Sequence, residues 1–337
     1  MKLRMPAEWE KQEAVWLAWP HNKEDWPDKF EPIPWVYAEI IRYLTQVERV
    51  RLVVKNAAQK KEVASILKRA GAKLEKVDFI LAPTDRVWLR DSGATVVYEG
   101  KKRMLLDWRF NAWAKYDNWH HDDKMPGRME SFLKLPRIEP MHKGKRVVLE
   151  GGSIDVNGKG TLITTDECLL SKKIQCRNPG FTREDYEQIF AKYLGISNVI
   201  WLENGIVGDD THGHVDDITR FVNATTIVTA TEKDKRDPNH ILLKENLKRL
   251  KKTRFTIAEL PMPKPVIFEG QRLPASYANF LIANNLVLVP MFNDPNDRIA
   301  LNILAELMPK HEIVGIYCGD FVWGLGTIHC ASQQEPT

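Results

Sequence analysis

The sequence predicts an α/β fold in which roughly five ββαβ units form a ring. Short β-branched runs occur in five pairs along the chain, and amphipathic stretches lie between several of the pairs. No low-complexity or Pro/Gly/Ser-rich segment divides the 337 residues, which favours one continuous domain over residues 1–337. A doubly wound α/β sheet is the alternative fold, because it also alternates strands and helices.

The strand-like runs are short and rich in Val, Ile and Thr, as the strands of small sheets are. In chain order the pairs are VDFIL (77–81) with ATVVYEG (94–100), RVVLEGG (146–152) with GTLITTD (160–166), NVIWLE (198–203) with TTIVTA (225–230), PVIFEG (265–270) with NLVLVP (285–290), and EIVGIYC (312–318) with GTIHCAS (326–332). The spacing between the pairs is uneven, so the repeat is a pattern of elements without clear sequence similarity.

Two stretches between the runs have the apolar spacing of helices. Apolar residues recur three and four positions apart in residues 182–195 and again in residues 296–308. This period places them on one face of an α-helix, so both stretches are predicted to be amphipathic helices.

The composition is that of an ordinary globular protein, with 43% hydrophobic and 28% charged residues and 11 Trp. The longest apolar runs are much shorter than the ~20 residues of a membrane-spanning helix, so we expect no membrane partner. The charged start, MKLRMPAEWEKQE, lacks the apolar core of a signal peptide. The four cysteines, at positions 168, 176, 318 and 330, fit reduced thiols. We therefore expect a cytoplasmic protein.

The formal net charge of +4 is small for this length, and the basic runs alternate with acidic or apolar residues in helical rhythm. This pattern is typical of solvated helix faces, whereas a nucleic-acid-binding surface is more strongly and more locally basic. We expect no nucleic-acid partner. The sequence leaves the oligomeric state open, a homo-oligomer included.

Acidic residues beside apolar runs need a chemical explanation. Asp91 lies three residues after Trp88 in DRVWLRDSGAT, and Glu150 ends an apolar run in VVLEGGSIDV. A carboxylate drawn into an apolar interior is costly unless hydrogen bonds or a cation compensate it. Either internal arginines satisfy these acids, or a cationic ligand does.

His214 and Asp216 lie two residues apart in GHVDD, before the β-branched and aromatic run ITRFV. We predict that this segment is extended, which would point the imidazole and the carboxylate to the same face. His212 could join that face, but the preceding GDDT is typical of a turn and favours a solvated loop residue.

A metal site is the alternative interpretation of the same segment. The H-x-H pattern of His212 and His214, with aspartates nearby, supplies ligands that suit zinc or manganese. A second ligand cluster of similar density is not evident elsewhere in the sequence, so we expect no metal.

Cys330 stands close to the C-terminus, in GLGTIHCASQQEP, where chains usually fray. Gly324 and Gly326 precede it and mark backbone that bends or approaches another group closely. Cys330 either fills a small gap in a core strand, as buried cysteines commonly do, or is a reactive thiol.

Together these segments resemble an agmatine deiminase, a family of the guanidine-modifying superfamily that includes the bacterial peptidylarginine deiminases. The resemblance covers nearly the whole chain and rests on the order and joint presence of PAEWEKQEAVWLAWPHN, WLRDSG, FNAW, LEGGSI, GHVDD, RLPASYANF, NDPNDRIAL and GTIHCASQQEP. It implies a five-bladed pseudo-symmetric α/β propeller of ββαβ units with a central active site. It also implies hydrolytic deimination of agmatine to N-carbamoylputrescine and ammonia, a step of putrescine biosynthesis, with no cofactor.

The resemblance implies a role for each motif residue. Cys330 matches the nucleophile, which forms a covalent thiouronium intermediate, and His214 matches the general acid and base. Glu150 matches the acid that supports them, while Asp91 and Asp216 match the aspartates that grip a small cationic guanidine substrate. These types suit the chemistry, because paired carboxylates can hold the N–H fork of a guanidinium and a thiolate is a good nucleophile at neutral pH.

Trp88 matches part of the aromatic wall of the family's pocket. The chain departs from the usual family pattern at Ala94, at Leu325 and Thr327, and at Asp155, where proline, glycines and histidine are common. None of these departures removes a catalytic position. They leave the residues that bind the substrate tail undetermined.

Three alternatives stay open. The first is a deiminase that acts on another guanidine compound, such as free or peptidyl arginine. The second is a metal-dependent ureohydrolase, which would release urea through a metal-activated water. The third is a protein that binds polyamine-like cations without turning them over, although Cys330 would then have no purpose.

Overall fold

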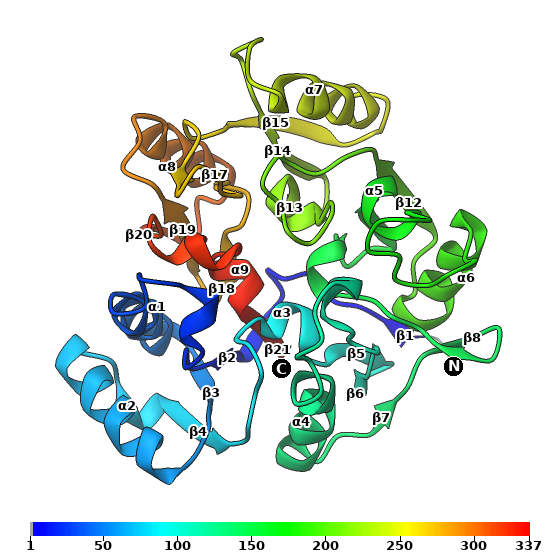
Figure 1. The fold of residues 1–337 in the computed structure, drawn as a ribbon. Coiled ribbons are helices and arrows are strands. Elements are labelled where there is room, and N and C mark those ends of the chain that lie inside the picture. The colour runs from blue at the N-terminus through cyan, green and yellow to red at the C-terminus, as the bar shows by residue number, and fades with distance from the viewer. Residues whose placement is uncertain (1–2) are drawn as a thin grey trace.

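Most strands of the described residues, 3–337, belong to five small sheets that surround a common centre in the computed structural model (Figure 1). In spatial order the sheets are β21 (Ser332–Pro336), β2 (Gln12–Ala18), β3 (Arg49–Val54) and β4 (Val77–Leu81); β1 (Leu3–Arg4), β5 (Thr95–Glu99), β6 (Lys102–Leu106) and β7 (Arg137–Ile138); β10 (Asp155–Val156), β11 (Thr161–Thr165) and β12 (Asn198–Leu202); β13 (Thr219–Asn223), β14 (Thr226–Thr231) and β15 (Thr256–Pro261); and β18 (Leu281–Ala283), β19 (Leu286–Met291) and β20 (Glu312–Tyr317).

Three of these sheets repeat one connection. β13 and β14 form an antiparallel pair, and α7 (Asn239–Leu250) then carries the chain to β15, which is parallel to β14. The same order recurs around α6 (Arg183–Leu194) in β10-β11-β12 and around α8 (Asn296–Leu307) in β18-β19-β20. A parallel pair needs a long crossover, which the amphipathic helix supplies. The predicted mixed α/β fold is confirmed, whereas one doubly wound sheet is not found within residues 3–337.

The first and last long strands share a sheet. β2 pairs antiparallel with β21, so that Trp16 lies opposite Gln333, and it pairs parallel with β3 after the crossover through α1 (Ile33–Val47). α2 (Ala57–Ala70) leads on to β4, and α4 (Met125–Leu133) lies between β6 and β7. Because β21 begins two residues after Cys330, this pairing fixes the end of the chain beside the centre.

The strand pairs observed differ from the pairs predicted. β4 and β5 lie in different sheets, and so do β12 and β14. Two of the five predicted pairs therefore joined the last strand of one sheet to a strand of the next. The first strands of two hairpins were missed because β10 has only 2 residues and β18 only 3, too few to give a pattern.

Three predicted strand runs are largely irregular. In 146–152 only the first residue belongs to a strand, the end of β9 (Lys145–Arg146), and 265–270 contains only β16 (Ile267–Phe268). The run 326–332 is wrong as a strand, because α9 (Ile328–Ala331) forms a helical turn there. Its backbone is held by the side chain of Asn279, whose Oδ1 accepts from the amide of His329 at 3.1 Å.

Both predicted helices are confirmed, as α6 and α8. α6 begins with a capping box, in which Thr182 and Asp185 each bind the other's backbone N–H, and it ends at Gly195 with φ 71°. A Cβ at Gly195 would lie 2.1 Å from the carbonyl oxygen of Leu3, so glycine is required for close packing as well as for the cap.

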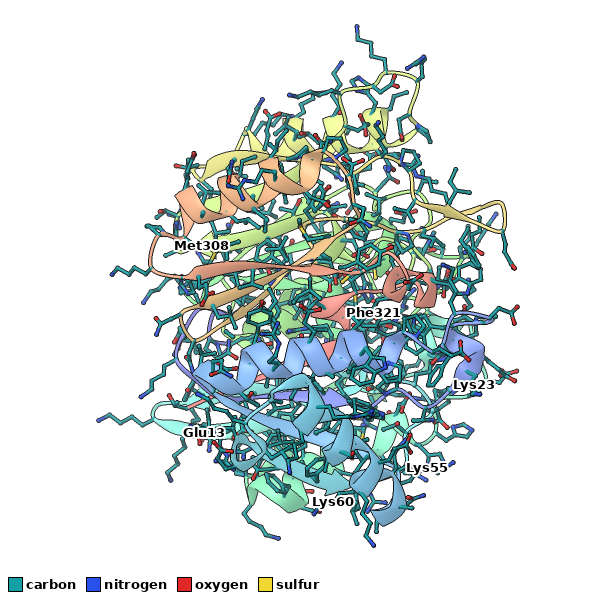
Figure 2. The ribbon with its side chains drawn as sticks, turned by 90° about the vertical axis from the view of Figure 1, so that its left-hand side faces the viewer. Glu13, Lys23, Lys55, Lys60, Met308 and Phe321 are labelled. Atoms are coloured by element: carbon teal, nitrogen blue, oxygen red, sulfur yellow. The ribbon has the colours of Figure 1, made fainter. Side chains whose placement is uncertain are left out.

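Apolar side chains fill the space between the helices and the sheets, and Trp16 and Trp26 are fully buried. α1 packs against α2 and β20 (Figure 2). Lys23 lies on the side of the molecule away from Glu13 and Met308 (Figure 2). In residues 3–337, no helix has the length and apolar character needed to cross a membrane.

The remaining elements are one-turn helices and two short ribbons. They are α3 (Leu89–Ser92), α5 (Asp166–Leu169), η1 (Lys23–Asp25), η2 (Leu74–Lys76), η3 (Ala112–Ala114), η4 (Asp122–Lys124), η5 (Gly151–Ser153), η6 (Val215–Asp217), η7 (Phe321–Gly324), the pair β8 (Met141–His142) and β9, and the pair β16 and β17 (Gln271–Arg272).

Candidate active site

Four helical turns meet at the centre of the molecule and carry the residues singled out in the sequence. α3 contacts both α9 and η5, and η5 contacts η6. α3 and α9 lie side by side at the centre of the ring of sheets (Figure 1). Asp91 lies in α3, Asp216 in η6 and Cys330 in α9, while Glu150 and His214 immediately precede η5 and η6.

The segment around His214 is not the extended strand that was predicted. η6 forms a 3-10 turn over Val215–Asp217, and the strand begins only at Thr219. The side chain of Asp209 organises this loop, because its Oδ2 accepts from the amides of Gly213 at 2.7 Å and His214 at 3.1 Å. His214 Nδ1 nevertheless lies 4.0 Å from Asp216 Oδ1, so both side chains reach the same cluster.

His212 does not join that cluster. It lies in the loop with φ 64°, partly exposed, and its Nδ1 is 3.6 Å from Glu167 Oε1. The interpretation of His212 as a loop residue is therefore correct.

The imidazole of His214 is fully buried among carboxylates. Its Nδ1 lies 3.8 Å from Asp91 Oδ1, and its Nε2 lies 3.9 Å from Glu150 Oε2. Neither ring nitrogen has a hydrogen-bond partner in the described part of the chain. Burial lowers the pKa of His214. Asp91, Cys168 and Glu150 outweigh burial and raise the pKa well above its usual value.

Glu150 has a cation of its own. Arg177 Nε donates to Glu150 Oε1 at 3.0 Å, and both side chains are fully buried. Burial raises the pKa of Glu150, yet Arg177 and His214 outweigh it and lower the pKa to about 2. Arg177 was not singled out in the sequence, although an internal arginine was one of the two expected solutions.

Asp91 shows the other solution, because no Lys or Arg contacts its carboxylate within residues 3–337. Its Oδ1 accepts from the amide of Gly152 at 3.0 Å, and its Oδ2 accepts from Trp113 Nε1 at 2.9 Å. Burial, together with the nearby Asp216 and Glu150, raises the pKa of Asp91 to about 6 despite the opposing effect of His214. The carboxylate is thus held in place without a permanent countercharge.

Gly152 is required at this position by close packing. A Cβ on Gly152 would lie 2.5 Å from His214 Nδ1 and 2.9 Å from Asp91 Oδ1. Any side chain would therefore displace the imidazole or the carboxylate.

Cys330 lies next to these acids and is nearly buried, with 5% of its surface exposed. Its thiol donates to Asp216 Oδ2 at 3.7 Å and accepts from Asn279 Nδ2 at 3.0 Å. Burial, then Asp216, Asp217 and Asp91, raise the pKa of Cys330 well above its usual value. Burial and these acids thus disfavour the thiolate, and a bound cation would oppose the effect of the acids.

Asp216 is only half satisfied. Its Oδ2 interacts with His329 Nδ1 at 2.7 Å, while its Oδ1 has no partner among the residues described. His329, in contact with Asp216, and Asn279, in contact with Cys330, were both missed as functional candidates. His329 stands in the GTIHC motif and could have been found there, whereas Asn279 carries no signal of its own.

A cavity of about 220 Å³ leads from the surface to Cys330 and Asp91. Trp88 lines it and is stacked on Phe321 with 5.9 Å between ring centroids. The wall and mouth also include Glu24, Asp25, Arg86, Trp113, Tyr116, Asp210 and Trp323. The cavity therefore ends at a thiol and at a carboxylate that no Lys or Arg contacts in the described residues, and aromatic rings surround it.

A second buried charge cluster adjoins the first. Arg220 donates through Nε to Asp155 Oδ2 at 2.6 Å and contacts Glu8, which in turn lies 3.0 Å from His329 Nε2. This explains the departure at Asp155, which serves as a structural partner of Arg220. The two clusters meet where His329 contacts Asp216.

Two groups of potential metal ligands occur in the described residues, namely Glu150 with Cys168 and His214, and Asp216 with Asp217 and Cys330. In each group one ligand atom per residue lies within 4.8 Å of the others. Neither includes His212, so the H-x-H segment does not act as one ligand unit. The expectation that no metal is needed stays a prediction.

Comparison with known proteins identifies relatives over the full length. The family model described as Porphyromonas-type peptidyl-arginine deiminase matches residues 4–336. The chain is 33% identical to agmatine deiminase of Pseudomonas syringae over 98% of this chain and 95% of that protein. It is 32% identical to agmatine deiminase of Pseudomonas aeruginosa over 99% and 95% of the two chains.

Solved structures agree with this relationship. A cysteine-to-serine variant of C. jejuni agmatine deiminase with substrate bound matches with a TM-score of 0.90 and 31% identity, over 99% of this chain and 96% of that one. Agmatine deiminase of Enterococcus faecalis matches with a TM-score of 0.90 and 30% identity, over 100% and 96% of the two chains.

Proposed function

This chain belongs to the Porphyromonas-type peptidyl-arginine deiminase family, and we propose that it hydrolyses agmatine to N-carbamoylputrescine and ammonia. One observation carries this proposal: Asp91, a buried carboxylate that no Lys or Arg contacts in the described chain, ends the same cavity as the Cys330 thiol. A guanidinium is the cation that would satisfy it. The full-length similarity to agmatine deiminases supports the choice of substrate.

Substrate binding uses the acids that lack partners. The planar guanidinium donates to Asp91 and to the free Oδ1 of Asp216, which orient its carbon toward the sulfur of Cys330. Its positive charge also offsets the carboxylates that raise the pKa of Cys330. The thiolate therefore forms when the substrate is bound, which confines the reactive nucleophile to the occupied site.

The chemistry then proceeds through a covalent intermediate. The sulfur of Cys330 bonds to the guanidinium carbon, and protonated His214 donates a proton to the departing nitrogen as the C–N bond breaks and ammonia leaves. Glu150 stabilises the charged imidazole and is itself held by Arg177. Neutral His214 next takes a proton from water, whose oxygen attacks the thiouronium carbon. The C–S bond breaks and releases the ureido product.

The charge of the cavity mouth supports agmatine over free arginine. Glu24, Asp25 and Asp210 face one guanidinium, Arg86, along the wall. Arg86 binds Asp25 at 2.6 Å and Lys115 binds Asp210, while Glu24 has no ion pair within the described residues. This net negative mouth favours a substrate whose far end is an ammonium over one that ends in a carboxylate.

Architecture and cellular context complete the proposal. The repeated ββαβ connection around a common centre supports a five-bladed pseudo-symmetric propeller, formed as one domain over residues 1–337. All four cysteines are free thiols, which supports a reducing, cytoplasmic location. We propose that the reaction requires no metal and that the protein has no nucleic-acid or membrane partner. A homo-oligomer is left as an outcome of size measurement.

A product assay with agmatine tests the function directly. Ammonia and N-carbamoylputrescine in equal amounts are expected. Urea with putrescine would instead support the ureohydrolase alternative, especially if a chelator abolished activity while Cys330→Ala retained it. The same assay with free arginine and a peptidyl arginine decides between guanidine substrates.

Mass spectrometry separates an enzyme from a binding protein. Rapid quenching after agmatine is added should reveal a covalent adduct on the peptide that contains Cys330. Tight agmatine binding with neither adduct nor product would establish the binding protein instead.

A further inference from the structure

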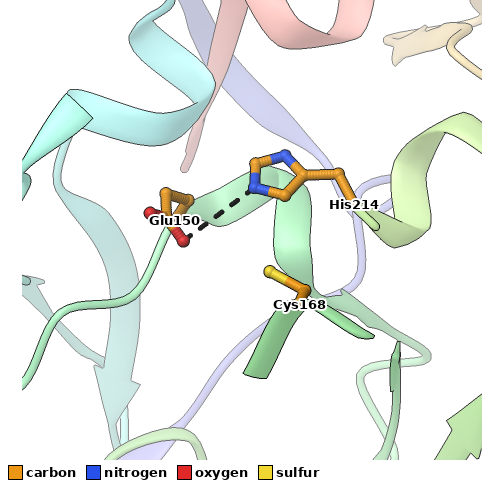
Figure 3. A group of neighbouring side chains, drawn as sticks. All are labelled: Glu150, Cys168 and His214. Atoms are coloured by element: carbon orange, nitrogen blue, oxygen red, sulfur yellow. Dashed lines mark ion pairs between the residues drawn. The ribbon is translucent and has the colours of Figure 1, made fainter. Parts of the chain in front are cut away.

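Cys168 lies against the catalytic imidazole, although the proposed reaction gives it no role. It belongs to α5 and is buried, with 1% of its surface exposed. Its Sγ, a ring nitrogen of His214 and a carboxylate oxygen of Glu150 all lie within 4.8 Å of one another. Figure 3 shows the sulfur directed toward the space between the other two side chains.

The atoms that face this space have no other partner. Glu150 Oε2 and His214 Nε2 are 3.9 Å apart, and neither makes a hydrogen bond within residues 3–337. Both side chains are completely buried. A buried polar atom without a partner carries an energetic cost, so the arrangement favours a ligand that satisfies both atoms at once.

We propose that Glu150, Cys168 and His214 form an inhibitory zinc site behind the imidazole. Carboxylate oxygen, thiolate sulfur and imidazole nitrogen are the three donor types that zinc takes, and three protein ligands leave a fourth position open. The soft sulfur donor disfavours magnesium and calcium, which prefer oxygen ligands. Binding releases the Cys168 thiol proton and the proton on His214 Nε2 to solvent.

The surroundings already orient each ligand. Zinc on His214 Nε2 leaves Nδ1 to carry the hydrogen, and Nδ1 faces Asp91 Oδ1 at 3.8 Å. Zinc on Glu150 Oε2 leaves Oε1 on Arg177 at 3.0 Å. Such carboxylate and arginine contacts are the outer groups that fix metal ligands in proteins.

Cys168 is fixed as well. Thr165 Oγ1 accepts from the amide of Cys168 at 3.1 Å and donates to the carbonyl of Gly213 at 2.5 Å. Because Gly213 directly precedes His214, this bridge ties α5 to the imidazole's own segment. The bridge keeps the sulfur beside the ring.

The distances require a modest contraction. Zinc bonds of about 2.0 to 2.3 Å in tetrahedral geometry place ligand atoms about 3.3 to 3.7 Å apart. The observed His214–Glu150 separation is 3.9 Å, and no pair in the group exceeds 4.8 Å. Side-chain shifts of about 1 Å or less therefore suffice, which rotamer adjustments supply.

Zinc at this position would stop catalysis without occupying the substrate cavity. It would take the nitrogen of His214 that faces Glu150 and prevent the imidazole from cycling its proton. None of the three ligands lines the cavity that ends at Cys330 and Asp91. Inhibition should therefore lower kcat and leave the KM for agmatine largely unchanged.

The other ligand group, Asp216 with Asp217 and Cys330, is the rival zinc site. Zinc there would meet the sulfur that lines the substrate cavity and would compete with agmatine. It would also require Cys330, whereas the site proposed here requires Cys168.

The test measures metal binding in Cys330→Ser, which removes the rival sulfur and does not depend on turnover. Equilibrium dialysis with zinc chloride after long incubation should give one zinc per chain. Cobalt chloride should produce a thiolate-to-cobalt charge-transfer band. Adding Cys168→Ser should abolish that band and weaken zinc binding by about tenfold or more. Adding Cys318→Ser, which removes a buried thiol outside the site, is the matched control. It should change neither the cobalt band nor the affinity for zinc.

Kinetics of the enzyme with Cys330 intact give a second readout. Zinc should inhibit it mainly through kcat, and Cys168→Ser should shift the half-inhibitory zinc concentration upward by about tenfold. Circular dichroism spectra of all variants confirm folding. Any one of three results would overturn the proposal. They are the absence of bound zinc in Cys330→Ser, a cobalt band that survives Cys168→Ser, and inhibition that is purely competitive with agmatine. The dialysis result stands whether or not agmatine is the substrate.

Discussion

Two buried charge clusters meet at the centre of this protein, and they differ in how their charges are satisfied. In one cluster, which we call the arginine network, Arg220 binds Asp155 and Glu8. It also donates to the carbonyl of Phe280 at 2.7 Å. The other cluster is the proposed catalytic centre, which we call the catalytic cluster. There, His214 Nδ1 and Asp216 Oδ1 have no hydrogen-bond partner in the described chain. The residues of both clusters are buried, so burial alone does not separate them.

The pKa directions of two acids, Glu8 in the arginine network and Asp91 in the catalytic cluster, illustrate this difference. Burial raises the pKa of Glu8, but Arg220 and His329 outweigh it and lower the pKa well below its usual range. In the catalytic cluster, burial and neighbouring acids raise the pKa of Asp91 to about 6. Paired buried charges thus mark the structural support of this fold, while the unpaired ones mark where a cation is expected.

The largest expected effect is that of Cys330→Ala. Without the nucleophile no thiouronium can form, so kcat should fall by about ten thousandfold or more. Ammonia release from agmatine measures it. The melting temperature should stay close to that of the parent, because one small buried side chain replaces another. Substantial residual turnover would mean that Cys330 is not the nucleophile.

Arg220→Met tests the arginine network and should act on stability. It leaves the buried Asp155 without a cation and Glu8 with only His329, which costs about 3 to 5 kcal/mol of unfolding free energy. Urea unfolding measures the loss, and the soluble yield reports it if the variant does not fold. Arg236→Met is the matched control, because Arg236 is exposed and pairs only with Asp234 in its own loop. Equal stability of the two variants would refute the structural role.

Asp91→Asn sharpens the comparison by separating activity from stability. The variant cannot hold the guanidinium charge, so kcat/KM should fall about a hundredfold. The folded-state pKa of Asp91, about 6, lies above the ordinary 3.8, so the ionised group weakens the fold above pH 6. The neutral amide removes that cost, and thermal unfolding at pH 7.5 should show no loss of stability.

The same substitution in the other cluster, Asp155→Asn, provides the contrast. Burial raises the pKa of Asp155 as well, but the substitution also removes a carboxylate that Arg220 binds at 2.6 Å. The buried Arg220 then keeps only Glu8 as an acidic partner, so the melting temperature should fall. Loss of stability in Asp91→Asn together with none in Asp155→Asn would reverse the comparison.

Acid pH should reproduce part of the Asp91→Asn effect. Because the pKa of Asp91 is raised to about 6, the carboxyl group becomes neutral below that pH and loses its hold on the cation. We expect kcat/KM to fall by about tenfold per pH unit below pH 6, and to recover when the enzyme returns to neutral pH. Residual activity of Asp91→Asn should lack this limb. A profile that is flat down to pH 4.5 would exclude Asp91 as the titrating group.

The smallest expected effect is that of Glu24→Gln at the cavity mouth. Glu24 is exposed, so its attraction for the substrate ammonium is screened by solvent. The KM for agmatine should rise about threefold with kcat unchanged. Glu62→Gln, also exposed but on α2 away from the cavity, is the control and should have no effect. An unchanged KM in Glu24→Gln would assign the substrate tail to other residues.

The sequence by itself determined the α/β class, the helices at 182–195 and 296–308, and the motif residues that gather at the centre. Local patterns carry this information, because helix periodicity and the order of motifs are properties of neighbouring residues. Acids beside apolar runs also indicated that Asp91 and Glu150 would be buried, and both are.

Only the tertiary structure decided which buried acid is paired and which is free. Arg177, which neutralises Glu150, lies 27 residues away in the sequence, and Asn279, which binds the thiol of Cys330, lies 51 residues away. The same holds for Cys168 beside His214 and for the helical turn that carries Cys330. Contacts between distant segments depend on how the sheets pack around the centre, and a single sequence carries no periodic signal for that packing.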